Sequence, residues 1–322
     1  MSHENKTRMP DARRFPRFAG VSTFCRFPMI DSLAAPPDWA VYGIPFDSGV
    51  TYRPGARFGP RAIREQSAYV KPFHLEHRLN LIERLSLCDA GDAPVQPYST
   101  RATQDAATEF ALSIGDDQTK LFAVGGDHSI ALANLRATRR RHGADRPLAL
   151  IHFDSHLDTV DQVWGEKYTH ASVFVRAIEE ELVDPTRMLS VGVKGPLNSE
   201  TDLDYGRDQG IELVTYDDCR NDDGAERIIA FIDERCDAGD PVYLTFDIDV
   251  IDPAYAPGTG TPSVGGFTSA EALDLIRSLA GINLVGADVV EVLPQSDPGG
   301  VTAFLAAHIL FEILCIGALR EV

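Results

Sequence analysis

The chain has 322 residues, with 48 Asp and Glu against 30 Lys and Arg, which gives a formal net charge of −18. Because binding to a nucleic-acid backbone needs Lys and Arg gathered on one face, this excess of acids argues against a nucleic-acid-binding protein. The apolar fraction of 44% is sufficient for a hydrophobic core, so disorder is excluded for most of the chain.

The sequence shows no export or membrane signal. Its first twenty residues are polar and basic, without the apolar stretch of a signal peptide. The most apolar run, residues 303–319, contains His308 and Glu312 and is short for a bilayer span, so we interpret it as a buried helix. Five scattered cysteines without a Cys-x-x-Cys pair are typical of reduced thiols. We therefore expect a cytoplasmic protein without a membrane partner.

Apolar or β-branched runs alternate with helical patterns along nearly the whole chain. The Pro- and Arg-rich residues 1–38 are predicted to form an arm that packs on the body or on a neighbouring subunit, and residues 39–322 to form one catalytic domain. In chain order, strands are predicted at 39–45, 85–89, 121–125, 148–154, 188–193, 211–216, 242–249 and 283–292. Helices are predicted at 60–67, 103–114, 130–141, 171–182, 225–238, 269–279 and 302–316.

This alternation predicts an α/β fold. Continuously apolar strands, such as residues 148–153, are typical of a sheet covered on both faces. Strands that alternate with helices favour a three-layer α/β/α sandwich around a mostly parallel sheet.

The strongest chemical signal is the segment IHFDSHLDT at the end of the fourth predicted strand. Its Asp154, His156 and Asp158 are spaced two apart, so an extended backbone would point all three to one side. Burial of two carboxylates with an imidazole is costly unless a cation compensates them. A polar strand end exposed to water is the alternative for this segment alone.

Two further segments place the same kinds of side chain at strand ends. LTFDIDVIDP carries Asp247 and Asp249, and FAVGGDHSI carries His128. Four carboxylates and two imidazoles are too many ligands for one small cation and suit two. Such a set without thiolates favours Mn²⁺, with Ni²⁺, Co²⁺ and Fe²⁺ as alternatives. Because two ions roughly 3.5–4 Å apart can deprotonate a shared water, the sequence predicts metal-assisted hydrolysis.

The blocks GGDHS, FDSHLD and FDIDVIDP, followed by PGTGTPSVGG, resemble the ureohydrolase family of arginases and agmatinases. Residues 42–65 and the segment DVVEVLP are most similar to its agmatinase, guanidinobutyrase and guanidinopropionase branch. The resemblance implies a metal-dependent hydrolase of linear amidines that releases urea and an amine. It also implies an eight-stranded parallel sheet, a pair of Mn²⁺ or Ni²⁺ ions per chain, and a trimer or hexamer in which a homologous subunit can take part.

The resemblance further implies roles for individual residues. One metal would be held by His128, Asp154, Asp158 and Asp247. The other would be held by His156, Asp154, Asp247 and Asp249, with Asp154 and Asp247 bridging. Beside Asp154, the catalytic residues would be His170, which passes a proton to the leaving amine, and Glu291, which holds the guanidinium. His152 is either a core histidine or a partner of this cluster, and we favour the former.

Three positions beside the expected guanidinium pocket depart from the family pattern. The usual His-Gly is His170–Ala171, and the usual alanine of the FDAHxD motif is Ser155. The usual Ser-Pro-Pro-Tyr after the glutamate begins here with Leu293. Since every metal ligand is intact, we expect retained chemistry and an altered substrate pocket.

The substrate is expected to be a small cationic guanidino compound, and several classes stay open. A substrate with a terminal carboxylate would need a cation at the pocket mouth, for which the candidates are Arg53, Arg57 and Lys167. Agmatine would need an acid there, either Glu166 or Asp161. Guanidine, an alkylguanidine or a biguanide such as metformin is favoured by the altered pocket, with Ala171 and Leu293, and by Val163, Trp164 and Tyr168 in a nearby loop. Arginine is least favoured.

Two functions of another class stay open as well. An arginase-fold deacetylase would use a single metal with three ligands and usually a tandem histidine pair. A non-catalytic or regulatory subunit of a mixed ureohydrolase oligomer is compatible with the unusual Ala171.

Overall fold

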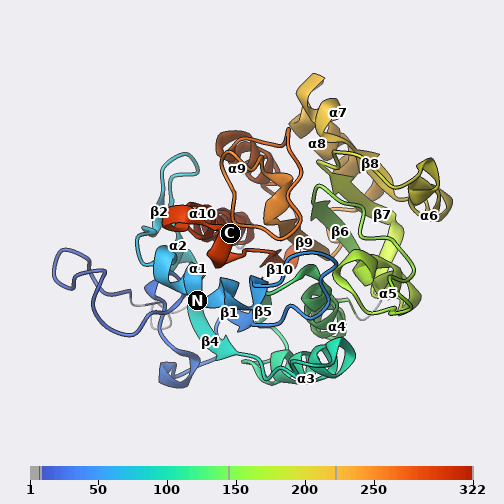
Figure 1. The fold of residues 1–322 in the computed structure, drawn as a ribbon. Coiled ribbons are helices and arrows are strands. Elements are labelled where there is room, and N and C mark those ends of the chain that lie inside the picture. The colour runs from blue at the N-terminus through green and yellow to red at the C-terminus, as the bar shows by residue number, and fades with distance from the viewer. Residues whose placement is uncertain (1–6, 8, 144–145, 222, 321–322) are drawn as a thin grey trace.

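The centre of the molecule is an eight-stranded sheet in which all the neighbouring strands run parallel (Figure 1). The structure is a computed structural model that describes residues 7, 9–143, 146–221 and 223–320. The strands are β1 (Trp39–Ile44), β4 (Leu87–Asp92), β5 (Lys120–Gly125), β6 (Leu148–Phe153), β7 (Val183–Val191), β8 (Glu212–Val214), β9 (Val242–Asp247) and β10 (Leu284–Val290). Their order across the sheet is β4-β1-β5-β10-β9-β6-β7-β8.

Helices cover both faces of this sheet, which gives the predicted three-layer α/β/α architecture (Figure 1). The helices are α1 (Gly59–Ser67), α2 (Leu81–Arg84), α3 (Thr100–Ser113), α4 (Ala131–His142), α5 (Val173–Glu179), α6 (Asp204–Gln209), α7 (Tyr216–Asn221), α8 (Gly224–Arg235), α9 (Ser269–Ser278) and α10 (Val301–Leu319). A short hairpin of β2 (Phe73–His74) and β3 (Leu79–Asn80) precedes α2.

The eight predicted strands correspond to the eight strands of the sheet, although several boundaries differ. The predicted helix 171–182 is shorter, because Glu181 takes a left-handed φ of 55° and the chain then enters β7 at Val183. Helices α6 and α7 were not predicted, since their short polar sequences lack the apolar periodicity of an amphipathic helix.

Helix α10 is long and apolar enough to cross a membrane by composition alone. However, 83% of its most apolar window is buried inside the protein, where it contacts α1, α9 and β10. The buried Glu312 is satisfied by Arg277 of α9, whose guanidinium donates to it over 2.6 Å. The prediction of a buried helix is therefore confirmed.

The N-terminal segment is partly tied to the sheet edge and partly projects from the body. The Thr7 hydroxyl accepts the amide N–H of Leu87 over 2.5 Å, and the amide of Phe24 donates to Asp89 over 2.9 Å. Between these points the chain extends outward, at the left of Figure 1. A contact of this arm with a neighbouring subunit stays a prediction.

The four central strands, β5, β10, β9 and β6, end next to one another in the sheet. His128 follows β5, Asp154 follows β6, Asp247 ends β9 and Glu291 follows β10. Because ligands of parallel α/β sheets bind outside the carboxyl ends of the strands, this edge is where a functional site is expected.

Candidate metal centre and active site

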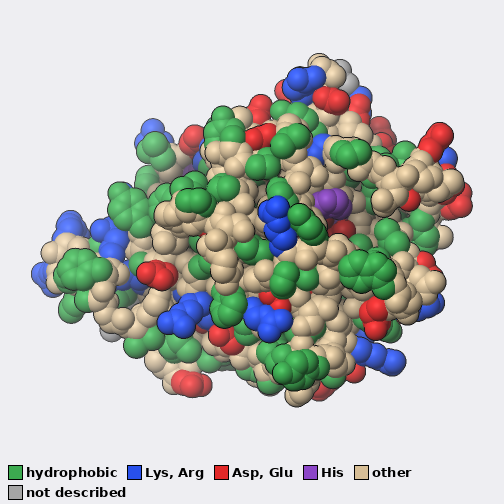
Figure 2. Space-filling view, viewed as in Figure 1, with side chains coloured by type: hydrophobic (Ala, Val, Ile, Leu, Met, Phe, Trp, Pro, Cys, Tyr) green, Lys and Arg blue, Asp and Glu red, His purple; other side chains and the backbone are tan. Residues whose placement is uncertain are grey.

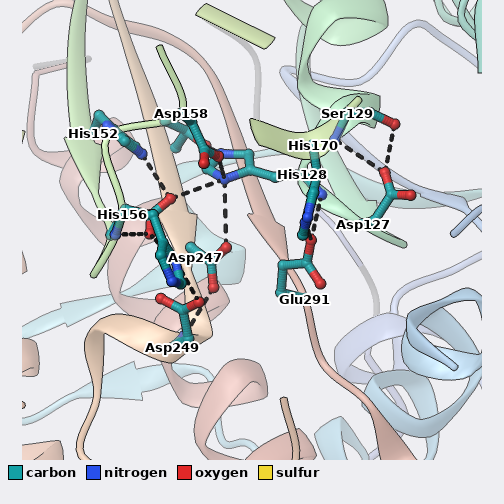
Figure 3. Close-up of polar contacts among 12 residues, drawn as sticks. Asp127, His128, Ser129, His152, His156, Asp158, His170, Asp247, Asp249 and Glu291 are labelled. Atoms are coloured by element: carbon teal, nitrogen blue, oxygen red, sulfur yellow. Dashed lines mark hydrogen bonds and ion pairs between the residues drawn. The ribbon is translucent and has the colours of Figure 1, made fainter. Parts of the chain in front are cut away.

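His128 is a fully buried member of a cluster of carboxylates and imidazoles. Its Nδ1 lies 2.9 Å from Asp158, 3.1 Å from Asp154 and 3.4 Å from Asp247, measured to carboxylate oxygens (Figure 3). Among the described residues this buried nitrogen has no hydrogen-bond partner. Since buried polar atoms are nearly always partnered, a ring nitrogen that faces three carboxylates fits a site built for a cation.

His156 forms a second group on the other side of Asp154. Its Nδ1 lies 3.3 Å from Asp154 Oδ1 and 3.1 Å from Asp249 Oδ2. The ligand atoms of Asp154, His156 and Asp249 lie within 4.8 Å of one another, and those of Asp154, His128, His152 and Asp158 form a similar group. Asp154 belongs to both groups, so the arrangement fits two adjacent cations that share this carboxylate.

Local turns, and not extended strands, aim these side chains. Asp154 Oδ1 accepts the amide N–H of His156 over 2.6 Å, and Asp247 Oδ1 accepts that of Asp249 over 2.8 Å. Such a turn, in which an aspartate bonds the backbone two residues further on, ends each strand. The expectation of extended backbone beyond Phe153 is therefore wrong, although the side chains still converge.

The cluster holds more negative charge than its own residues can neutralise. Burial and the neighbouring Asp249 and Asp154 raise the pKa of Asp247 well above its usual value. Burial alone would raise the pKa of Asp154 too, but contacts with His128, His152 and His156 outweigh it and hold that pKa well below its usual range. Divalent cations would compensate this charge, and the oxygen-rich donor set suits Mn²⁺.

A chain of buried hydrogen bonds fixes the orientation of His128. Its Nε2 lies 2.8 Å from the hydroxyl of Thr245, which donates to Asp288 Oδ1 over 2.5 Å. The Tyr243 hydroxyl donates to the other oxygen of Asp288, also over 2.5 Å. Because Thr245 donates to Asp288, it accepts from His128, and the proton of His128 lies on Nε2. The lone pair on Nδ1 is then free for a cation.

Sequence reasoning missed Asp288 and undervalued His152. His152 Nε2 lies 2.9 Å from Asp154 Oδ2, and its Nδ1 lies 3.2 Å from the Ser190 hydroxyl. His152 is thus a partner of the cluster and not an uninvolved core residue. For Asp288, the only signal in the sequence was an acid inside an otherwise apolar strand.

His170 and Glu291 form a pair beside the cluster (Figure 3). His170 Nδ1 lies 2.8 Å from Glu291 Oε1, which also accepts the amide N–H of His128 over 2.9 Å. Burial disfavours the charged form of His170, but the charge and hydrogen bond of Glu291 outweigh it and raise the pKa of His170 to about 9. The pair therefore combines a buried carboxylate with an imidazole that can carry a proton.

A cavity of about 310 Å³ opens onto His170 and the metal cluster, and Glu291, which contacts His170, is not among its lining residues. At its inner end, the lining residues include Thr51, His156, Asp158, His170 and Asp247. Figure 2 shows a histidine side chain in a hollow near the centre of this face of the molecule. A small ligand can therefore reach His170 and the metal cluster from solvent.

The predicted specificity residues divide into two groups. Ala171 and Val163 line the cavity. Leu293 is 2% exposed and packs near Gly55 and Gly260, and Trp164 is 85% exposed and does not line the cavity. Neither Leu293 nor Trp164 lines this cavity, although Leu293 and Glu291 Oε2 both lie next to Gly260.

The charged candidates have partners elsewhere. The Arg53 guanidinium stacks over the Tyr52 ring, and Arg57 pairs with the buried Asp47. The predicted acid Asp161 pairs with Arg176 and lies 3.7 Å from Lys167. None of the candidates Arg53, Arg57, Asp161 and Lys167 lines the cavity. The acid that does line its mouth is Asp202, which the sequence did not single out.

Comparison with known proteins gives consistent matches over nearly the whole chain. Residues 37–315 match the model of the arginase family. The guanidinopropionase of Pseudomonas aeruginosa is 42% identical over 307 residues, which cover 95% of this chain and 94% of that protein. The mitochondrial agmatinase of Gallus gallus is 38% identical over 309 residues, with 95% and 88% covered. The solved structure of proclavaminate amidino hydrolase from Streptomyces clavuligerus superimposes with a TM-score of 0.87 at 38% identity, covering 95% of this chain and 100% of that chain.

Proposed function

The chain belongs to the arginase family and is a metal-dependent ureohydrolase of guanidino compounds, and from this premise we propose that it hydrolyses a short linear guanidino compound to urea and an amine. The observation that carries the proposal is that His170 lines the inner end of the cavity beside the carboxylate–imidazole cluster, with Glu291 Oε1 2.8 Å from its Nδ1.

In this proposal Glu291 receives the guanidinium group. A guanidinium presents pairs of N–H donors in one plane, which a carboxylate accepts well, and Glu291 is buried, so its charge is poorly screened. His170 then supplies a proton from Nε2 to the leaving amine, while Glu291 holds the ring through Nδ1.

We further propose that the two groups around Asp154 hold two Mn²⁺ ions. His128 and Asp158 would serve one ion, His156 and Asp249 the other, and Asp154 with Asp247 would bridge them. When bound, the ions would lower the pKa of a water and supply the nucleophile at neutral pH. The mixed oxygen and imidazole donors without thiolates support Mn²⁺.

The structure gives less support to the other candidate functions. A deacetylase with one metal leaves the second group, around His156 and Asp249, without a role. A non-catalytic subunit has no need for the paired His170 and Glu291. Metformin and related biguanides lose part of their support, because Trp164 does not line the cavity, whereas Ala171 and Val163 do.

The test is product release by the purified chain loaded with Mn²⁺. Urea and amine are measured with 3-guanidinopropionate, 4-guanidinobutyrate, agmatine, guanidine and dimethylbiguanide. We expect equal amounts of urea and amine from at least one of the linear guanidino compounds. The variant Glu291→Gln serves as a control, because it should keep its metals but lose most turnover. Absence of urea from all five compounds contradicts the proposal.

A further inference from the structure

The cavity that opens onto His170 and the metal cluster has a defined outer end. Its inner residues belong to the metal cluster and to His170, and its outer residues are Pro196, Leu197, Asn198 and Asp202. A substrate whose guanidinium lies at Glu291 must therefore direct its tail toward the segment 196–202. The chemistry of this outer wall then decides which tail is preferred.

The wall between the two ends is mostly apolar. Leu157, Val160 and Val163 line it, and Leu197 continues it at the mouth. These side chains suit a chain of methylene groups, since ligand pockets combine apolar walls with a few placed polar groups. The wall therefore fits the linear part of an alkylguanidine.

The cavity lining includes residues of the metal cluster and the neighbouring His170. Apart from these, Asp202 is the charged residue among the described residues that line it. Among the described residues that line the cavity, none is Lys or Arg. Asp202 has a fixed position, because its Oδ2 accepts the amide N–H groups of Asn198 over 2.9 Å and of Ser199 over 3.2 Å. Its carboxylate thus presents a placed negative charge to the outer end of the cavity.

The surroundings of Asp202 increase the reach of that charge. Asp202 also lines a second cavity of about 220 Å³, where Leu203, Ile211 and Leu213 are further lining residues. The apolar side chains among these residues reduce the screening of the Asp202 charge by water. Arg207 lines the second cavity too, but its guanidinium pairs with Asp204 over 3.0 Å.

From this arrangement we propose that Asp202 determines specificity at the substrate's far end, by selecting guanidino compounds that end in a positive charge over those that end in a carboxylate. The inference rests on the proposed function and extends it to the tail of the substrate. It singles out an aminoalkylguanidine, such as agmatine, as the preferred class.

The test uses three substrates of similar length that differ in the charge of the far end. Agmatine ends in an ammonium, n-butylguanidine in a methyl group and 4-guanidinobutyrate in a carboxylate. The kcat/KM for urea release is measured for each with the full chain loaded with Mn²⁺. We expect the order agmatine, n-butylguanidine, 4-guanidinobutyrate.

The variant Asp202→Asn removes the charge and keeps an oxygen that can accept the two amide hydrogens. We expect the agmatine to n-butylguanidine ratio of kcat/KM to fall about fivefold, because a partly exposed charge pair contributes roughly 1 kcal/mol. Asp208→Asn is the matched control, since Asp208 is exposed on α6 and lines neither cavity. Its ratio should stay near that of the wild type.

Ionic strength provides a second readout. Added salt should lower the agmatine preference of the wild type and have little effect on that of Asp202→Asn, because salt screens exposed charges. A wild-type preference for 4-guanidinobutyrate, or an equal loss with all three substrates in Asp202→Asn, overturns the inference and leaves the proposed function intact. Absence of urea from all three substrates overturns both.

Discussion

The backbone N–H of Thr51 donates to Nε2 of His170 over 2.9 Å, and the Thr51 hydroxyl lies 2.7 Å from the same nitrogen. The amide is a partner for the neutral ring, whose Nε2 carries a lone pair. The hydroxyl can accept a hydrogen bond when Nε2 is protonated. Thr51 therefore provides a partner for both states through which a proton-transferring histidine must pass.

The variant Thr51→Val tests this relationship, since it keeps the amide donor and removes the hydroxyl acceptor. In the wild type, burial lowers the pKa of His170, but Glu291 raises it to about 9. Because Thr51→Val removes a hydrogen-bond partner of the charged ring, the pKa of His170 should fall below this value. If His170 acts as an acid, activity is lost as pH rises through this pKa. The falling limb of the kcat profile should then move to lower pH by roughly one unit. Thr51→Ser should restore it, and a Thr51→Val profile that superimposes on the wild type contradicts the role.

The hydrogen-bonded chain behind His128 should control metal affinity. Asp288→Asn weakens the acceptor of Thr245, whose hydroxyl lies 2.8 Å from His128 Nε2. Loss of such an outer partner typically costs roughly 10- to 100-fold in metal affinity. Titration of the metal-free protein with Mn²⁺, followed by calorimetry, measures this change. An unaltered affinity in a folded Asp288→Asn variant argues against the orienting role.

The sequence was sufficient to predict the carboxylate–imidazole cluster because its signal is local. Asp154, His156 and Asp158 follow one strand in a fixed spacing, and Asp247 and Asp249 follow another. In a parallel sheet these strand ends must meet at one edge, so residue type and topology together predict the cluster. Even the incorrect expectation of extended backbone did not change which side chains converge.

Residues of the substrate pocket were not predictable in the same way. Arg53 and Lys167 lie in suitable loops, but Arg53 stacks on Tyr52 and Lys167 lies near Asp161, and such tertiary partners carry no sequence pattern. Asp202 forms a capping box with Ser199 at the start of a short 3-10 helix, a motif that predicts a helix terminus and not a substrate contact. It reaches the cavity only because the segment 196–202 folds back beside Leu157.

Metal removal should destabilise the protein in a pH-dependent manner. Burial and the neighbouring Asp249 and Asp154 raise the pKa of Asp247 above the unfolded value of 3.8, so its protonated form is favoured in the metal-free native state. As pH rises above about 4, the unfolded state releases this proton first and the metal-free protein loses stability. Bound cations remove this penalty, because they stabilise the ionised carboxylate.

The melting-temperature difference between Mn²⁺-loaded and metal-free protein should therefore widen as pH rises above about 4. At a metal concentration 100 times the dissociation constant, the added stability is about 2.7 kcal/mol. Thermal unfolding at several pH values measures the difference. A difference that stays constant or narrows with rising pH contradicts this interpretation.

The variant His156→Ala separates the two metal groups. It removes a ligand that faces Asp154 and Asp249 and leaves the surroundings of His128 intact. We expect one bound metal per chain in place of two, and a loss of kcat of roughly a hundredfold or more. Metal analysis after gel filtration gives the stoichiometry. Two tightly bound metals in this variant would show that His156 is not a ligand.

In the proposed mechanism, urea release requires two bound metals per chain. The decisive measurement is a titration of the metal-free wild-type chain with Mn²⁺, in which bound metal per chain and urea release are recorded on the same samples. We predict that activity appears mainly as the second equivalent binds and reaches its maximum at two metals per chain. Full activity at one metal per chain, or two bound metals without urea release from any linear guanidino compound, would contradict the account.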